Sequence, residues 1–290
     1  MASGRTVPLA PITLSTVAPN HPDEGPMADL DVTIADGIAT LTMHRPEARN
    51  ALSNEMRDAL SEWLHRIERD DDVRCVVLTG SGDHFMSGGD VKSFVDLEAM
   101  EPDERWSYMA HRIHDLHTVM FAMRRMEKPI IAKVRGAVAG AGVSFAATCD
   151  LVIASDDAFF VLAYVNIGTS PDGSSTWFLP KAIGLKKAME MAMLGDRHTA
   201  EEMREAGLVN WVVPAADLDA EAGRLARRLA DGPTRAIGAA KRLLTTSWEH
   251  QMERQLQLEA EAFADCALTG DFAEGVNAFV DKRPPRFTGR

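Results

Sequence analysis

The sequence predicts an α/β protein with a core of roughly 200 residues followed by a helical tail. Two observations predict this class. Short β-branched runs at 73–79, 129–134 and 151–154 are separated by longer segments in which apolar residues recur at helical spacing. Beyond residue 233 only the helical spacing continues. Because parallel strands need a long crossover, usually a helix, these strands are expected to pair in parallel.

The first regular elements are expected to be a hairpin and a helix. Residues 31–36 and 38–43 alternate around the turn Asp36-Gly37, which is typical of a β-hairpin. Asn50 or Ser53 can cap a helix that runs to the acidic turn at 70–72. Residues 1–27 are rich in Pro, Ser and Thr and show no apolar periodicity, so they are expected to be a disordered leader, native or left over from cloning.

Strand and helix signals then alternate through a core placed at 28–225. The expected elements are a strand at 73–79, a helix around 103–125, a strand at 129–134, a small-residue segment at 136–142, a helix through Cys149, a strand at 151–154, a strand-like run at 158–161, and a helix over 174–183 opened by Pro171-Asp172-Gly173. The region 226–290 is expected to be helical. It contains a linker at 231–233, an amphipathic segment at 241–263 and a short helix at 271–282.

Composition excludes several functional classes. The 290 residues include 31 Lys and Arg against 43 Asp and Glu, a formal net charge of −12, and the basic residues form no block longer than a doublet. Nucleic-acid binding is therefore not expected. Three widely spaced cysteines exclude a disulfide framework and favour a reducing, cytoplasmic setting. No apolar run approaches the ~18 residues of a membrane span, and no export signal is recognisable.

Two Gly-rich segments follow predicted strands, at Ser87-Gly88-Gly89 and at 136–142. Each alone is better explained as a turn or as close helix packing, because neither matches a phosphate-loop pattern. Together they have a chemical use that neither has alone. Two free backbone N–H groups from two loops, one of them at a helix N-terminus, can bind a developing oxyanion.

Five blocks in order carry a resemblance to a known family. They are Pro46-Glu-Ala-Arg49-Asn50-Ala-Leu52, Phe85-x-Ser-Gly-Gly89-Asp90-x-Lys92, Lys128-Pro129-Ile-Ile-Ala with 136–142 and Cys149-Asp150, Gly168-x-x-Pro171-Asp172-Gly173, and Phe279-x-x-Lys282-Arg283-x-Pro285-x-Phe287. From about Leu30 to the C-terminus the chain resembles the crotonase superfamily, the enoyl-CoA hydratase/isomerase family. The resemblance implies a ClpP/crotonase-like spiral of ββα-type repeats with a C-terminal helical trimerisation region. It also implies an acyl-CoA thioester substrate, no cofactor other than the coenzyme A of that substrate, and a homotrimer or hexamer.

The resemblance assigns roles by motif position. The N–H groups of Gly89 and Ala141 would hold the thioester oxygen as it becomes an enolate, although many members have glycine where this chain has Ala141. For coenzyme A, the matching positions are Arg49, Ser87, Gly88, Lys92 and Lys282, the last reaching the coenzyme A of a neighbouring subunit. Hydratases of the family use two glutamates, at the positions of Ser144 and Tyr164. Neither replacement suits acid/base work near neutrality, so a standard hydratase mechanism is not expected.

Asp172 is the remaining candidate for the catalytic acid/base. Pro-Asp-Gly is a favourable turn and Asp is a common N-cap, so a structural role competes with a catalytic one. Family members that shift a double bond resemble this segment and carry an aspartate there, which favours an isomerase. Burial would raise the pKa of Asp172 and a helix start would lower it, so the net direction is open. The alternatives are a hydratase with an atypical site, a haloaryl-CoA dehalogenase with Asp172 as nucleophile, and a non-catalytic coenzyme A-binding homologue.

Three histidines and several aromatic residues are assigned to the acyl pocket rather than to a metal. His111, His114 and His117 follow one another at spacings of three, but the outer two diverge around a helix and no acid or cysteine cluster joins them. No metal site is therefore predicted. Three further residues are expected to line the substrate pocket: Ser144, Tyr164 and Trp177. The two aromatic residues are expected to be either core residues or the walls of a flat site.

Overall fold

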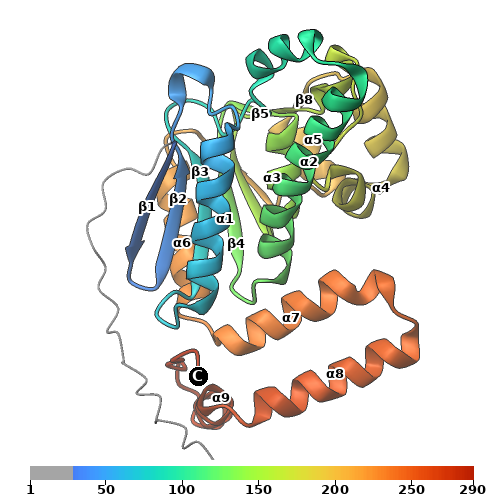
Figure 1. Cartoon of the computed structure of the whole chain (residues 1–290). Helices are drawn as coiled ribbons and strands as arrows, with labels where there is room; N and C mark the ends of the chain where they lie inside the picture. The colour runs from blue at the N-terminus through green and yellow to red at the C-terminus, as the bar shows by residue number, and fades with distance from the viewer. Residues whose placement is uncertain (1–28) are drawn as a thin grey trace, which may run out of the picture.

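The computed structural model describes residues 29–290, in which helices cover two β-sheets (Figure 1). The larger sheet has the strand order β1-β2-β3-β4-β6-β9. Its β1 and β2 form the predicted antiparallel hairpin, with Ala35 paired to Ile38, and every other neighbouring pair is parallel. The strands are β1 (Leu30–Ala35), β2 (Ile38–Met43), β3 (Cys75–Gly80), β4 (Ile130–Val134), β6 (Leu151–Ser155) and β9 (Trp211–Val213). The leader predicted at 1–27 lies outside the described residues.

A second sheet, in the order β5-β7-β8, corrects the prediction for the small-residue segment. Its strands are β5 (Ala137–Ala139), β7 (Phe159–Val161) and β8 (His198–Thr199). The strand-like run predicted at 158–161 corresponds to β7, whereas β5, β8 and β9 were not predicted. Strands of two or three residues are too short to show an alternating pattern, and their partners lie far away in sequence.

The larger sheet is buried on both faces. Along β3 the side chains alternate, so that Val76 and Leu78 join the main core while Cys75 and Val77 face the other way. The main core lies beneath α1 (Asn54–Arg69), α2 (Pro102–Arg125) and α3 (Ala141–Thr148), and α6 (Leu218–Ala230) covers the opposite face. This two-sided burial explains why β3 reads as a continuous apolar run.

Helix α1 resolves the choice between two caps. Ser53 is its N-cap, and the Ser53 hydroxyl accepts a hydrogen bond from the Met56 N–H at 3.0 Å. Asn50 instead adopts a left-handed conformation, and its side chain donates to the carbonyls of Ser81 and His84. Asn50 therefore stabilises the loop that follows β3 rather than the helix.

The remaining helices carry two further corrections. They are α4 (Ser175–Leu194), α5 (Ala200–Ala206), α7 (Thr234–Thr246), α8 (Met252–Ala267) and α9 (Gly270–Val280). Helix α4 extends beyond the predicted end and is kinked at Gly184. The segment predicted as continuous at 241–263 is broken after Thr246, where the hydroxyls of Thr245, Thr246 and Ser247 donate to backbone carbonyls one turn back. Such local bonds compete with helix continuation.

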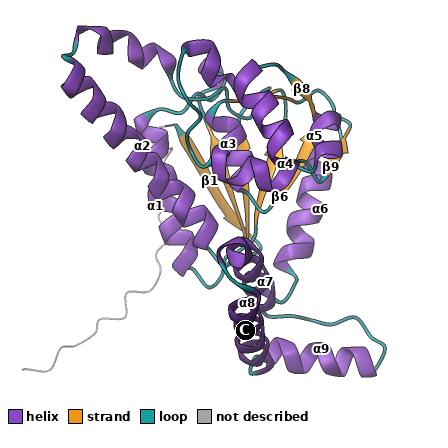
Figure 2. Cartoon of the chain, turned by 90° about the vertical axis from the view of Figure 1, so that its right-hand side faces the viewer, coloured by secondary structure: helices purple, strands orange, loops and turns teal. Residues whose placement is uncertain are grey.

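Helices α7 to α9 form an arm that projects from the α/β core (Figure 2). A buried ion pair joins the arm to the core, with Lys241 Nζ 2.8 Å from Asp150 Oδ2. Asp150 also accepts the N–H of Ile130 at the start of β4. The predicted boundary at 225/226 falls inside α6, and the predicted linker at 231–233 separates α6 from α7. Within residues 29–290, no helix combines the length and apolar character needed to span a bilayer.

Candidate active site

Two loops meet at the carboxyl ends of β3 and β4, where ligands bind in many parallel sheets. The loop after β3 pairs with β5 through a bridge between Met86 and Val138. Gly88 and Gly140 both have positive φ, at 107° and 50°. A Cβ atom on Gly140 would lie 3.4 Å from the Gly88 Cα atom. Glycine at these positions allows both the left-handed backbone and the close approach of the two loops.

The approach brings two backbone N–H groups to one cavity. Leu52 bridges to Gly89 through the Gly88 carbonyl and the Asp90 N–H, which leaves the Gly89 N–H outside that pairing. Ala141 is the first residue of α3, so its N–H has no acceptor within the helix. Neither N–H group has an acceptor within residues 29–290, and both residues line the cavity. The pair can therefore bind an oxygen that acquires negative charge.

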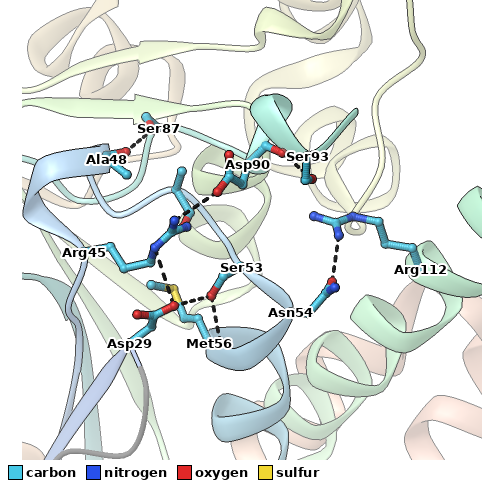
Figure 3. A network of polar contacts seen from close by, with 11 residues as sticks. Asp29, Arg45, Ala48, Ser53, Asn54, Met56, Ser87, Asp90, Ser93 and Arg112 are labelled. Atoms are coloured by element: carbon cyan, nitrogen blue, oxygen red, sulfur yellow. Dashed lines mark hydrogen bonds and ion pairs between the residues drawn. The ribbon is translucent and has the colours of Figure 1, made fainter. Parts of the chain in front are cut away.

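A polar network holds the Gly89 loop in place (Figure 3). Arg45 lies between two carboxylates, 3.0 Å from Asp90 and 3.5 Å from Asp29. Ser53, the cap of α1, donates to the same Asp29 carboxylate at 2.6 Å. The residue that follows Gly89 is thus tied to the start of α1, which limits movement of the Gly89 donor.

The cavity has a volume of about 1430 Å³, large enough for an extended ligand. It lies between α2, the two loops and the segment that leads into α4. Its walls are mainly apolar and include the aromatic side chains of Phe94, Trp106, Phe121, Tyr164, Trp177 and Phe178.

Asp172 also lines this cavity and does not cap α4. The N-cap is Ser174, and no side chain accepts a capping bond there. The Asp172 carboxylate instead accepts a hydrogen bond from the Tyr164 hydroxyl at 2.6 Å. The Asp172 side chain therefore does not have the N-cap role that competed with a catalytic one.

Burial raises the pKa of the Asp172 carboxyl above its usual value. The hydrogen bond from Tyr164 and the electrostatic interactions with His117 and Arg112 act in the opposite direction but are weaker. This settles the direction that the sequence left open. A carboxylate with a raised pKa is a stronger base.

Known proteins resemble this chain over most of its length. The profile of a family described as enoyl-CoA hydratase/isomerase matches residues 33–290. The chain belongs to the enoyl-CoA hydratase/isomerase family. It is 37% identical over 258 residues to the 1,2-epoxyphenylacetyl-CoA isomerase of Escherichia coli K12, with 89% of this chain and 97% of the relative covered. It is also 37% identical over 261 residues to a probable enoyl-CoA hydratase of Rhodobacter capsulatus, with coverage of 89% and 96%.

Solved structures confirm the predicted crotonase fold of this family member. The crystal structure of an enoyl-CoA hydratase from Polaromonas sp. JS666 superposes with a TM-score of 0.84 at 34% identity, covering 89% of this chain and 99% of the other. The chain is accordingly an acyl-CoA enzyme of the enoyl-CoA hydratase/isomerase family. The names of its relatives include both isomerases and hydratases.

The two positions to which the resemblance assigns the glutamates of family hydratases hold hydroxyl side chains, Ser144 and Tyr164. Tyr164 lines the cavity. Ser144 was also expected to line it, and the structure corrects this: Ser144 is completely buried and is not part of the cavity wall. The reason is that α3 directs Ser144 toward the Asp172 backbone, where its hydroxyl donates to the Asp172 carbonyl at 3.0 Å.

Trp177 is 41% exposed and lines the cavity. The Lys181 ammonium lies 3.1 Å from its ring centroid, and the Arg124 guanidinium lies 5.7 Å away. Arg124 also pairs with Glu249 in the arm. Trp177 is therefore fixed by cation–π contacts instead of being packed in the core.

The histidines of α2 divide between the cavity and its surroundings. His114 and His117 line the cavity with their rings edge to face, 6.0 Å between centroids. His111 does not line it and bonds the Ser107 carbonyl. Among residues 29–290, no group of three or more His, Cys, Asp or Glu side chains is arranged to hold a metal ion.

The residues assigned to coenzyme A are only partly gathered at the cavity. Ser87 and Gly88 line it, whereas the exposed Arg49 and Lys92 lie on the neighbouring loop surface and Lys282 follows α9 in the arm. Sequence reasoning missed four cations that line the cavity. Three of them lie on α2, where the helical spacing is visible in the sequence. One sequence does not show which face of that helix turns toward the cavity. The four are Arg57, Arg105, Arg112 and Arg124.

Proposed function

We propose that the protein is an enoyl-CoA isomerase that shifts a double bond along the acyl chain, with Asp172 as the proton shuttle. One observation carries the proposal. The Asp172 carboxylate, whose pKa is raised, lines the same cavity as the Gly89 and Ala141 N–H groups, which have no acceptor within residues 29–290. This set of groups matches a reaction that needs one base and one oxyanion site.

The proposed reaction needs no second catalytic carboxylate. Asp172 removes a proton from the α carbon or the γ carbon of the enoyl thioester. The electron pair of that C–H bond moves toward the carbonyl, and the N–H groups of Gly89 and Ala141 stabilise the resulting enolate oxygen. Asp172 then returns the proton to a different carbon. The double bond moves, no atom is gained or lost, and the enzyme returns to its starting state.

Hydration is disfavoured by the same site. Water addition needs one group to activate water and another to deliver a proton. Burial, together with the charge of Asp172, raises the pKa of Tyr164 well above its ordinary value. Ser144 is completely buried and does not line the cavity. Neither hydroxyl is suited to replace a hydratase glutamate.

Coenzyme A binding and assembly also belong to this proposal. Ser87 and Gly88 line the cavity, and with the exposed Arg49 and Lys92 they would hold the coenzyme A part of the substrate. Lys282 would act on the coenzyme A of a neighbouring subunit in a homotrimer or hexamer. The exposed apolar side chains of the arm support such an assembly. They include Leu244, Trp248, Met252, Phe263, Leu268 and Phe279.

The reaction is tested by incubating the enzyme with 2-enoyl-CoA and 3-enoyl-CoA thioesters in D₂O and analysing the products by NMR and mass spectrometry. We expect interconversion of the two double-bond positions with deuterium entering the acyl chain. Accumulation of 3-hydroxyacyl-CoA as the main product would contradict the proposal in favour of a hydratase. Halide release from a haloaryl-CoA thioester, with a trapped aryl ester on Asp172, would contradict it in favour of a dehalogenase.

A further inference from the structure

We infer that Tyr164 is a positioning residue for Asp172, holding the Oδ1 atom of the carboxylate so that Oδ2 exchanges the proton with the substrate. This inference rests on the proposed function, because it gives Asp172 the role of base. It assigns a task to a side chain that stands where hydratases of the family have a glutamate.

The two carboxylate oxygens of Asp172 have different surroundings. Oδ1 accepts the 2.6 Å hydrogen bond from the Tyr164 hydroxyl. Oδ2 has no hydrogen-bond partner within the described part of the chain. Tyr164 is only 8% exposed and belongs to the main hydrophobic core, so its ring is held by packing. A fixed donor on one oxygen restricts rotation of the carboxylate and presents the other oxygen to the cavity.

Helix α3 links this support to the oxyanion donors. Ala141 begins the helix and Ser144 lies one turn later. The Ser144 hydroxyl donates to the Asp172 carbonyl at 3.0 Å and lies 3.4 Å from the Tyr164 hydroxyl. The Ser175 hydroxyl donates to the same carbonyl at 2.9 Å. The base is thus held at its backbone and at Oδ1, in fixed relation to the Ala141 donor.

The groups that face Asp172 make the effect of Tyr164 measurable as a pH dependence. Helix α2 contributes His117 and Arg112, the segment Ala163–Ile167 contributes Tyr164, and the contacts from α3 and α4 are uncharged serines. Tyr164, His117 and Arg112 each favour the ionised carboxylate. Burial raises the pKa of Asp172 and the hydrogen bond from Tyr164 lowers it. Removing the Tyr164 hydroxyl is therefore expected to raise the pKa of Asp172 further. Since the base must be ionised, the acid limb of kcat/KM moves to higher pH.

The test compares Tyr164→Phe with Tyr108→Phe, the chain having two tyrosines. Tyr108 is 39% exposed on α2 and does not line the cavity, which makes it a matched control. We expect Tyr164→Phe to lower kcat by about 10-fold to 100-fold, the value of one hydrogen bond to a charged group. KM should change little, and the acid limb should move upward. Tyr108→Phe should change neither.

A second measurement keeps the inference testable if Tyr164→Phe does not fold. In the Tyr108→Phe protein the only phenol is Tyr164, so its ionisation can be followed by ultraviolet absorbance. We expect no tyrosinate signal until the protein unfolds, because burial and the Asp172 charge raise the pKa of Tyr164. Titration at about pH 10, the ordinary tyrosine value, would overturn the inference.

Failure of the inference is distinguishable from failure of the proposed function by measuring Asp172→Asn in parallel. If Asp172→Asn is inactive while Tyr164→Phe keeps the kcat and pH profile of the unaltered enzyme, the positioning role is overturned and the base stands. If Asp172→Asn is fully active, the proposed function itself fails, and Tyr164 loses the role that depends on it.

Discussion

Replacing Asp172 with asparagine is expected to lower kcat by about 10²-fold to 10⁴-fold, the usual contribution of general acid–base catalysis. The amide keeps the shape of the side chain and can still accept the Tyr164 hydrogen bond through its oxygen. It cannot take up and return a proton near neutral pH. Acyl-CoA binding should persist because the oxyanion donors Gly89 and Ala141 are unaffected.

The measurement combines steady-state kinetics on the interconverting enoyl-CoA pair with calorimetric titration of a substrate analogue. Asp196→Asn is a suitable control because Asp196 is exposed between α4 and β8, away from the cavity. This control should behave as the unaltered enzyme. A non-catalytic coenzyme A-binding protein predicts no turnover in either variant or in the unaltered chain, whereas full activity of Asp172→Asn would place the chemistry elsewhere.

Replacing Gly142 with alanine is expected to lower kcat by about 10²-fold to 10³-fold, the cost of losing one oxyanion donor. A Cβ atom at this position would lie 2.4 Å from the Met86 carbonyl oxygen, so the backbone must shift. Met86 belongs to the loop that carries Gly89, and Gly142 follows Ala141 in α3. The substitution therefore separates the two donors without removing a functional side chain.

Gly223→Ala is the matched control for this substitution. Gly223 lies on the exposed face of α6, and a Cβ atom there would meet nothing within 4 Å. It should leave kcat unchanged and stabilise the protein by about 0.5–1 kcal/mol, because alanine has the higher helix propensity. Urea denaturation of both variants separates a local displacement of the donors from general unfolding. A folded Gly142→Ala enzyme with unchanged kcat would show that the spacing of the two loops is unimportant.

The elements predicted from sequence are those whose pattern is local. The hairpin around Asp36-Gly37 and helix α1 show complete periodic patterns, and β3 is a long apolar run bounded by turns. The missed strands β5, β8 and β9 have two or three residues each and form only by pairing with distant segments. The break between α7 and α8 was missed because hydroxyl side chains near Thr246 can stand within a helix or end it, and tertiary contacts decide which.

The candidate site was predictable to the extent that motifs fix backbone positions. Gly89, Ala141, Tyr164, Asp172 and Trp177 were named from sequence, and the structure brings all five to one cavity. What motifs do not encode is the direction of each side chain. The sequence therefore does not show that the Ser144 hydroxyl turns toward the Asp172 backbone instead of lining the pocket.

Charge shows the same limit in the four arginines on the cavity wall. Helical spacing groups three of them along α2 but does not show which face of that helix turns inward, because the packing of α1 and α2 decides that direction. A net charge of −12 is therefore compatible with a cavity suited to an anionic thioester.

The most direct test of the account is an experimental structure with an enoyl-CoA or a tight-binding enolate analogue in the cavity. We expect the thioester oxygen about 2.7–3.1 Å from both the Gly89 and Ala141 nitrogens, as an oxyanion site requires. Asp172 Oδ2 should lie about 3–3.5 Å from the carbon that loses or gains the proton, with Oδ1 still bound to Tyr164. A thioester oxygen held elsewhere, or Asp172 beyond reach of the acyl chain, would contradict the account.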